Sequence, residues 1–235
     1  YGDKLHENPQ EAYQEFTDLV LRTIQRGGKV IVPAFAVGRT QELVYILRDQ
    51  MEAGRLPRIP IYVDSPLAVN ATKIFEEFPE LFDKETMELI KHGEHPVLHF
   101  NQVHYVNSVD ESKSLNDRKE PMVIISASGM AETGRILHHL RNNIENPRNS
   151  IAIVGWQAPD TLGRRLAERA PMVNIFGEAY HRRAEVATIG GLSAHAGQDL
   201  LLKYAAAANG RLKKLYLIHG EKEKAEILMG KMRER

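Results

Sequence analysis

Two histidines stand where an imidazole could do chemistry. His195 ends the small-residue stretch Gly190-Gly-Leu-Ser-Ala-His195 after an expected strand, and His219 closes another expected strand just before Gly220-Glu221. A histidine at the carboxyl end of a strand is well placed to act as a base or a metal ligand near neutral pH. The ordinary alternative for each is a solvated or structural side chain, and the local sequence leaves both interpretations open.

The other histidines, out of ten in all, favour structural roles. His138 and His139 are expected in one helix, with one of them packed and the other exposed. The remaining six lie in polar, loop-like or strand-end contexts: His6, His92, His95, His99, His104 and His181. A catalytic zinc usually takes three protein ligands, and a two-metal site about twice that number. The sequence has no His-x-His, His-Glu-x-x-His or Asp-His pattern, so its ligands fall short of a complete metal site.

Three glycine-containing stretches could bind phosphate. Ser126-Ala-Ser-Gly-Met130 runs from an expected strand toward a helix, where backbone N–H groups can face an anion. Gly38-Arg39-Thr40 and Gly163-Arg164-Arg165 add an arginine, which can hold a phosphate through two hydrogen bonds. Asp64 also follows a strand, but the Ser-Pro after it makes a helix cap equally plausible, and we leave it out of the catalytic set.

The elements that must position these residues alternate between helices and strands. Helices are expected from Pro9 to Arg26 and from Gly38 to about Ala53. The expected strands are Lys29 to Pro33, Ile61 to Val63, Val97 to His99, Met122 to Ser126, Ser150 to Val154, Met172 to Ile175, Ala184 to Ile189 and Lys214 to His219. This alternation predicts an α/β fold with a mainly parallel sheet flanked by helices. Ligands of such sheets gather beyond the carboxyl ends of the strands.

Composition narrows the class of protein. Of the 235 residues, 43% are apolar and 26% are charged, which is the composition of a globular protein. The 31 basic residues balance 31 acidic ones, so the formal net charge is zero and any contact with a polyanion must be local. It has no cysteine, which excludes disulfides and thiolate metal sites, and no apolar run long enough to span a bilayer. We therefore expect a cytoplasmic protein without membrane association. Residue 1 is Tyr1 rather than methionine, so we expect the chain to begin within a longer protein.

Taken together, these stretches resemble the β-CASP branch of the metallo-β-lactamase superfamily over nearly the whole chain. The resemblance rests on Tyr1-Gly-Asp, Val32-Pro-Ala-Phe-Ala-Val-Gly-Arg-Thr-Gln-Glu-Leu43, Tyr62-Val-Asp-Ser-Pro-Leu67, Ala127-Ser-Gly-Met130, Gly134-Arg-Ile-Leu-His-His-Leu140, Gln157-Ala-Pro-Asp-Thr-Leu-Gly-Arg-Arg165, Leu192-Ser-Ala-His195 and Ile218-His-Gly-Glu221. It implies a β-CASP domain over residues 1–186. It also implies that residues 187–235 are the C-terminal segment of an αββα metallo-β-lactamase domain whose N-terminal part is absent.

The resemblance also implies a site with two zinc ions. His219 matches the late histidine that binds zinc, and His195 matches the histidine near the scissile phosphate, where it stabilises or protonates during cleavage. The carboxylate partner of that histidine lies in a Glu-Ser-Thr-Tyr-Gly stretch of which this chain begins at the tyrosine. Gly197 stands where many relatives have aspartate, so a hydrogen bond from that aspartate is in doubt here.

The implied function is that of a zinc-dependent ribonuclease acting on single-stranded RNA, because RNA-cleaving relatives carry the late histidine. Arg39, Ser128, Gly129, Arg164 and Ser193 are the candidates for backbone phosphates. Since most zinc ligands are missing, we expect the fragment alone to be inactive, and a homodimer remains open. One alternative is a non-catalytic module that binds RNA or a partner. Another is an unrelated α/β enzyme that binds a phosphorylated small molecule through Ser126 to Met130.

Overall fold

The computed structural model describes residues 2–5, 8–84, 86–88, 97–193, 195–208, 211, 213–218 and 220–234. Contacts within the chain divide it into two compact units. The larger unit is Tyr13–Ile189, and the smaller unit joins Tyr1–Ala12 to Gly190–Arg235. The domain boundary predicted from the sequence, between residues 186 and 187, falls within strand β8 (Glu185–Thr188). That boundary stays a prediction.

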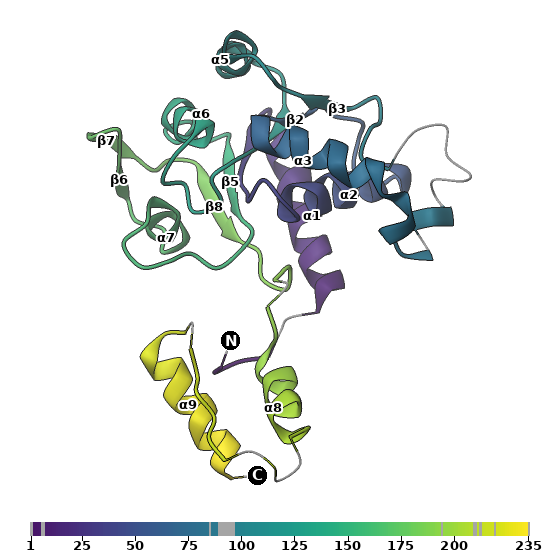
Figure 1. Cartoon of the computed structure of the whole chain (residues 1–235). Coiled ribbons are helices and arrows are strands. Elements are labelled where there is room, and N and C mark those ends of the chain that lie inside the picture. Colours follow the sequence, from purple (N-terminus) through teal and green to yellow (C-terminus); the bar gives the residue numbers. More distant parts are fainter. Residues whose placement is uncertain are drawn as a thin grey trace. The chain divides into compact units, whose positions relative to one another are not determined.

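The larger unit is built on a six-stranded sheet in which every pair of neighbours is parallel (Figure 1). The strand order is β3-β2-β4-β1-β5-β8. The bounds are β1 Lys29–Pro33, β2 Ile61–Val63, β3 Val103–Tyr105, β4 Met122–Ser126, β5 Ser150–Ile153 and β8 Glu185–Thr188. Each connection carries helix and returns to the same edge of the sheet. The predicted α/β class, with a mainly parallel sheet flanked by helices, is confirmed.

Helices connect the strands of the larger unit and cover its sheet, and two further helices, α8 and α9, lie in the smaller unit. They are α1 Pro9–Gln25, α2 Arg39–Glu52, α3 Pro66–Glu77, the 3₁₀ turn η1 Pro79–Leu81, α5 Val109–Asp117, α6 Arg135–Asn143, α7 Leu162–Ala167, α8 Gln198–Ala206 and α9 Lys222–Arg233. Helix α6 contacts β1, and α7 contacts β5 and β8. Within the described ranges, no helix combines the length and the apolar character needed to cross a membrane.

The core lies on the two central strands. All five residues of β1 and all five of β4 are buried, as expected for parallel strands that are covered on both faces. Lys29 is the charged exception, with 6% of its surface exposed, and its ammonium group donates to the carbonyl oxygen of Leu115 at 2.7 Å. Burial is the main reason that the pKa of Lys29 is lowered.

The amino edge of the sheet is tied together by polar contacts. Glu185, at the start of β8, accepts hydrogen bonds from Arg22 on α1 at 2.6 Å and from Arg26, the residue after α1, at 2.7 Å. Arg26 also donates to the hydroxyl of Ser150, at the start of β5. Burial opposes ionisation of Glu185, but the hydrogen bonds from the two arginines outweigh it and hold the pKa of this carboxyl below its usual value. These contacts bind α1 to the last two strands.

Two predicted strands are wrong. Val97 to His99 is irregular, and the strand beside β2 is Val103–Tyr105 instead. The side chains of Val97 and Leu98 are buried, so their apolar character reflects packing within a loop. The Tyr105 hydroxyl donates to the carbonyl oxygen of Leu98 at 2.7 Å and connects this loop to β3. Residues 214–218 form no strand either, because no described segment pairs with them, and His219 lies outside the described residues.

A short hairpin was also missed. Met172–Ile175 is a strand as predicted (β6), but it pairs antiparallel with β7 (Glu178–His181) instead of joining the parallel sheet. The hairpin lies beside α6 and α7 (Figure 1). Gly177 lies in the turn between β6 and β7 and has φ +82°, a left-handed conformation that residues other than glycine rarely adopt.

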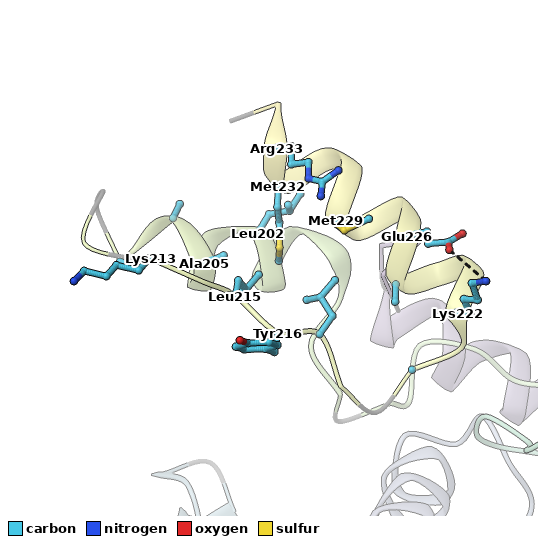
Figure 2. Close-up of a pocket in the computed structure, with 15 residues that line it drawn as sticks. Leu202, Ala205, Lys213, Leu215, Tyr216, Lys222, Glu226, Met229, Met232 and Arg233 are labelled. Atoms are coloured by element: carbon cyan, nitrogen blue, oxygen red, sulfur yellow. Dashed lines mark ion pairs between the residues drawn. The ribbon is translucent and has the colours of Figure 1, made fainter.

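The smaller unit consists mainly of α8 and α9. Gln198 connects its parts: the side-chain amide donates to the carbonyl oxygen of Gly2 at 2.6 Å and accepts from the Lys231 ammonium group at 2.6 Å. An open pocket lined by both apolar and charged residues lies between these helices and residues 213–217 and 220, and Lys222 and Glu226 pair beside it (Figure 2).

We expect Ile124→Ala, in the middle of β4, to lower the free energy of unfolding of the larger unit by about 3 kcal/mol, because it leaves a cavity at a fully buried position. Urea denaturation followed by the fluorescence of Trp156 measures the change. Val109→Ala, at a position that is 57% exposed, is the control and should change stability by less than about 0.5 kcal/mol. Equal effects of the two substitutions would contradict the position of the core.

Candidate functional site

The carboxyl ends of four adjacent strands form the candidate site. In the order β2, β4, β1 and β5, these strands lie side by side and point the same way. Each is followed by a loop that leads into a helix: residues 64–65, 127–134, 34–38 and 154–161. The predicted phosphate-binding stretches all lie in these loops or in the first turns after them. This is the edge at which ligands of parallel sheets bind.

Asp64 is the centre of a buried polar cluster at this edge. Its carboxylate is fully buried and accepts hydrogen bonds from Ser112 Oγ at 2.5 Å, His139 Nε2 at 2.6 Å and Arg135 Nη1 at 2.7 Å. His139 is fully buried as well, and its Nδ1 lies 3.0 Å from the side-chain oxygen of Asn116. Both ring nitrogens of His139 therefore have a side-chain oxygen atom as a partner.

The ionised form of Asp64 is favoured. Burial alone would raise its pKa, but hydrogen bonds from His139, Ser112 and Arg135 outweigh burial and hold the pKa below its usual value. A buried carboxylate with three donors is satisfied, whereas the same carboxylate without them would be very costly. The cluster is therefore a condition for this edge of the sheet to fold as it does.

The cluster also fixes the chain around it. The guanidinium of Arg135 donates to the carbonyl oxygens of Val106 at 3.3 Å and Asn107 at 3.0 Å, and the Ser126 hydroxyl donates to the carbonyl oxygen of Asp64 at 2.7 Å. The loop after β3, the end of β4 and the start of α6 are thus held at one point. The helix cap that seemed plausible for Asp64 belongs to its neighbour Ser65, which accepts from the amide of Ala68 at 3.3 Å.

Ser128 uses its hydroxyl inside its own loop. Its Oγ accepts from the amides of Glu132 at 3.1 Å and Thr133 at 3.4 Å. Beside it, Gly129 packs under the ring of Phe35, and an added Cβ would lie 2.9 Å from that ring. Both predicted phosphate-binding residues of this loop thus have a structural role.

The loops after β4 and β5 are locked together. The amide of Gly163 donates to the carbonyl oxygen of Met130 at 3.0 Å, and the side chain of Gln157 donates to the carbonyl oxygen of Gly129 at 3.1 Å. A Cβ on Gly163 would lie only 1.8 Å from Gln157 Oε1. Glycine is therefore required at residue 163 by the close approach of the two loops, whatever its relation to phosphate.

The two arginines predicted to bind phosphate are engaged with carboxylates. Arg39 pairs with Glu42, and Arg164 pairs with Glu168 at 2.6 Å. Burial is the first reason that the pKa of Glu42 is raised, and Arg39 opposes this shift. The Arg164–Glu168 pair is exposed and contributes little stability, so a ligand could displace it at small cost, whereas Arg39 is largely buried beside Glu42.

Ser193 and His195 belong to the smaller unit. Ser193 Oγ lies 3.1 Å from His195 Nδ1 and accepts from the His195 amide at 3.3 Å, so the serine hydroxyl orients the exposed imidazole. The structure therefore brings Arg39, Ser128, Gly129 and Arg164 to neighbouring loops of the larger unit, and Ser193 and His195 to one turn of the other. Their roles toward RNA stay predictions, as does zinc binding by His219, which lies outside the described residues.

No group of three or more histidine and carboxylate side chains in the described part of the chain could hold a metal ion. The described residues therefore do not fit a complete zinc site by themselves. The Asp64 cluster, in which an arginine occupies one side of the carboxylate, is an ion-pair network.

The Asp64 cluster was missed from the sequence, although one of its members was partly foreseen. Of the two adjacent histidines, His139 is buried and His138 is exposed beside Phe176, which confirms the prediction that one of them packs. Arg135 and His139 are four residues apart in one helix, which places both on the same face. This spacing was the only local pattern that could have indicated a shared partner. Their common partner is 71 residues from Arg135 along the chain, a distance that local patterns do not bridge.

We expect Asp64→Asn to lower the free energy of unfolding by about 3 kcal/mol near neutral pH, because Arg135 loses the charge that compensates it and His139 loses its carboxylate partner. The pKa of Asp64 is lowered in the folded state, so its contribution is complete above about pH 4, the value of an unfolded aspartate, and is lost as the pH falls through the folded-state pKa. Urea denaturation between pH 7 and pH 3 should therefore show the variant approaching the unmodified chain in acid.

The exposed Asp117, at the end of α5, provides the matched control. Asp117→Asn should change stability by less than about 0.5 kcal/mol. A constant difference between Asp64→Asn and the unmodified chain over the whole pH range would rule out the assigned ionisation.

We also expect Gly163→Ala to lower the free energy of unfolding by about 2 kcal/mol and to change Trp156 emission, because the new methyl group displaces Gln157 next to that tryptophan. The control is Gly155→Ala, where an added Cβ meets nothing within 4 Å. Emission spectra and urea denaturation of both variants make the comparison. An unperturbed Gly163→Ala would contradict the close contact between the loops.

Relatives of known name match almost the whole chain. A ribonuclease of Thermus thermophilus is 39% identical over 232 residues, which are 99% of this chain and 52% of the relative. Transcription termination factor FttA of Pyrococcus abyssi is 36% identical over 92% of this chain and 34% of the relative. An RNase J-like protein of Methanocaldococcus jannaschii is 31% identical over 94% of this chain and 50% of the relative. The chain thus spans between about a third and a half of these relatives.

Two family models match consecutive parts of the chain. The model described as the Beta-Casp domain matches residues 40–166, which include three of the four loops of the candidate site. The model described as a Zn-dependent metallo-hydrolase RNA specificity domain matches residues 179–235, which include Ser193 and His195. The first model alone covers more than half of the chain, and the sequence motifs of the chain indicate the same family. The chain therefore belongs to the Beta-Casp family.

Proposed function

We propose that the chain is part of a zinc-dependent ribonuclease that hydrolyses phosphodiester bonds in single-stranded RNA. The observation that carries the proposal is the pair of Ser193 and His195, an exposed imidazole held by a hydroxyl at 3.1 Å within the segment that matches the RNA specificity domain. The relative named as a ribonuclease supports the reaction, and the predicted single-stranded substrate follows from the motif resemblance.

The chemistry assigned to this chain is proton transfer by His195. An imidazole takes or gives a proton near neutral pH, and the contact with Ser193 restrains the orientation of the ring. A positioned imidazole of this kind can protonate the oxygen that leaves when a phosphodiester bond breaks. Ser193 is a positioning residue in this scheme.

Zinc, when bound to the whole protein, supplies a hydroxide nucleophile and stabilises negative charge. His219 is the proposed ligand from this chain. Because the described residues hold no cluster that could bind a metal, we place the remaining ligands outside them and assign no step to the metal. This chain alone is then expected to bind RNA without cleaving it.

We expect His195→Ala in the complete protein to lower kcat for cleavage of a labelled single-stranded RNA by 10² to 10⁴, the usual contribution of a general acid or base. Ser193→Ala should lower kcat by about tenfold, since the imidazole remains but loses its restraint. The control is His181→Ala, an exposed histidine on β7 that should leave kcat unchanged.

Full activity of His195→Ala would refute the proposed role. Zinc content by elemental analysis provides a separate readout, and His219→Ala should lower the amount of bound metal. The alternative is a module of the same fold that binds RNA or a partner without catalysis. RNA binding by the complete, zinc-loaded protein with no cleavage would establish that alternative.

A further inference from the structure

Large apolar side chains are exposed at the carboxyl edge of the parallel sheet. They lie on the loops after β1 and β5 and in the first turn of α3, and their exposed fractions are Phe35 51%, Val37 59%, Trp156 44% and Leu67 64%. Isolated exposed apolar residues are common, but several on neighbouring loops, at the edge where such sheets bind ligands, mark a binding surface. Two of the four are aromatic.

The two aromatic residues are held by the same loop. The ring of Phe35 packs against Gly129, whose added Cβ would lie 2.9 Å from it. Gln157, which follows Trp156 directly, donates to the carbonyl oxygen of the same glycine at 3.1 Å. Phe35 and Trp156 therefore stand on backbone that is fixed before any ligand arrives, and a preformed surface loses less conformational entropy on binding.

The charges at this edge are balanced. Arg39 pairs with Glu42, Arg164 with Glu168, and Arg135 with the buried Asp64. This edge therefore lacks the excess of cations that draws in a phosphate backbone. Its exposed aromatic rings suit a different contact, because every nucleobase has a flat face that can stack on an aromatic side chain.

We propose that Phe35 and Trp156 stack on bases of the single-stranded RNA substrate. This inference rests on the proposed function, because it takes RNA as the ligand. The occupant is single-stranded, since paired bases present no free faces to a protein side chain. Stacking of this kind tolerates any base, so the contact contributes affinity without choosing a sequence.

The test uses the fluorescence of Trp156, which is the single tryptophan of the sequence. The probes are a ten-nucleotide oligouridylate and an abasic ribose-phosphate decamer of the same charge. We expect the oligouridylate to quench the emission of this chain on binding and the abasic decamer to leave it unchanged. Fluorescence anisotropy of labelled decamers measures the affinities.

Substitutions separate stacking from general packing. Trp156→Ala and Phe35→Ala should each weaken binding of the oligouridylate by about tenfold, close to the loss of one stacked base. Trp156→Phe keeps an aromatic face and should stay within about threefold of the unmodified chain. Phe78→Ala is the matched control, because Phe78 is 47% exposed at the end of α3. Equal melting temperatures would show that the variants fold.

The outcomes distinguish this inference from the proposed function. Equal binding of both decamers without quenching would overturn stacking and leave RNA binding intact. Binding of neither decamer would overturn both.

Discussion

A single buried carboxylate organises the edge of the sheet where the candidate site lies. Asp64 directly follows β2, and its three donors come from α5 and α6, so one charge connects the end of this strand to two helices that follow later in the sequence. An isolated buried charge is too costly to persist, and each donor is therefore required for the others to remain in place. The loop 127–134 begins and ends within this cluster, because Ser126 and Arg135 both contact Asp64.

The two edges of the sheet use charge differently. At the amino edge, Arg22, Arg26 and Glu185 fasten α1 to the outer strands, and nothing in that network points to a ligand. At the carboxyl edge, the ionised side chains are also paired, yet the apolar rings of Phe35 and Trp156 remain half exposed. The amino edge thus stabilises the fold, while the carboxyl edge keeps a surface available.

Local patterns predicted the central strands and the first two helices because each depends on its own residues. The β-branched run of β1 and the proline and glycine boundaries of α1 need no information from elsewhere. Val97 to His99 failed because an apolar run reports burial, and burial occurs in loops as well as in strands. Lys214 to His219 failed because a strand also needs a neighbour that supplies its hydrogen bonds, and no described segment pairs with residues 214–218.

The site was predictable only in part for a similar reason. The glycine-rich stretches were located correctly at one edge, since parallel strands bring their ends together. Their interactions were not, because Gly163 and Gly129 pack against residues that are distant in the sequence, namely Met130 and Phe35. A glycine that permits two loops to touch and a glycine that admits a phosphate look the same in a sequence.

The strand order has a consequence for how the protein acquires its fold during synthesis. The central strand β1 pairs with β4, which follows roughly ninety residues later, and with β5, which follows later still. At the usual pace of translation, on the order of 5 to 20 residues per second, β1 waits several seconds for its first partner. During that interval the backbone groups of Val30, Ile31 and Val32 lack their partners from β4, and the nascent chain is exposed to aggregation at this apolar strand.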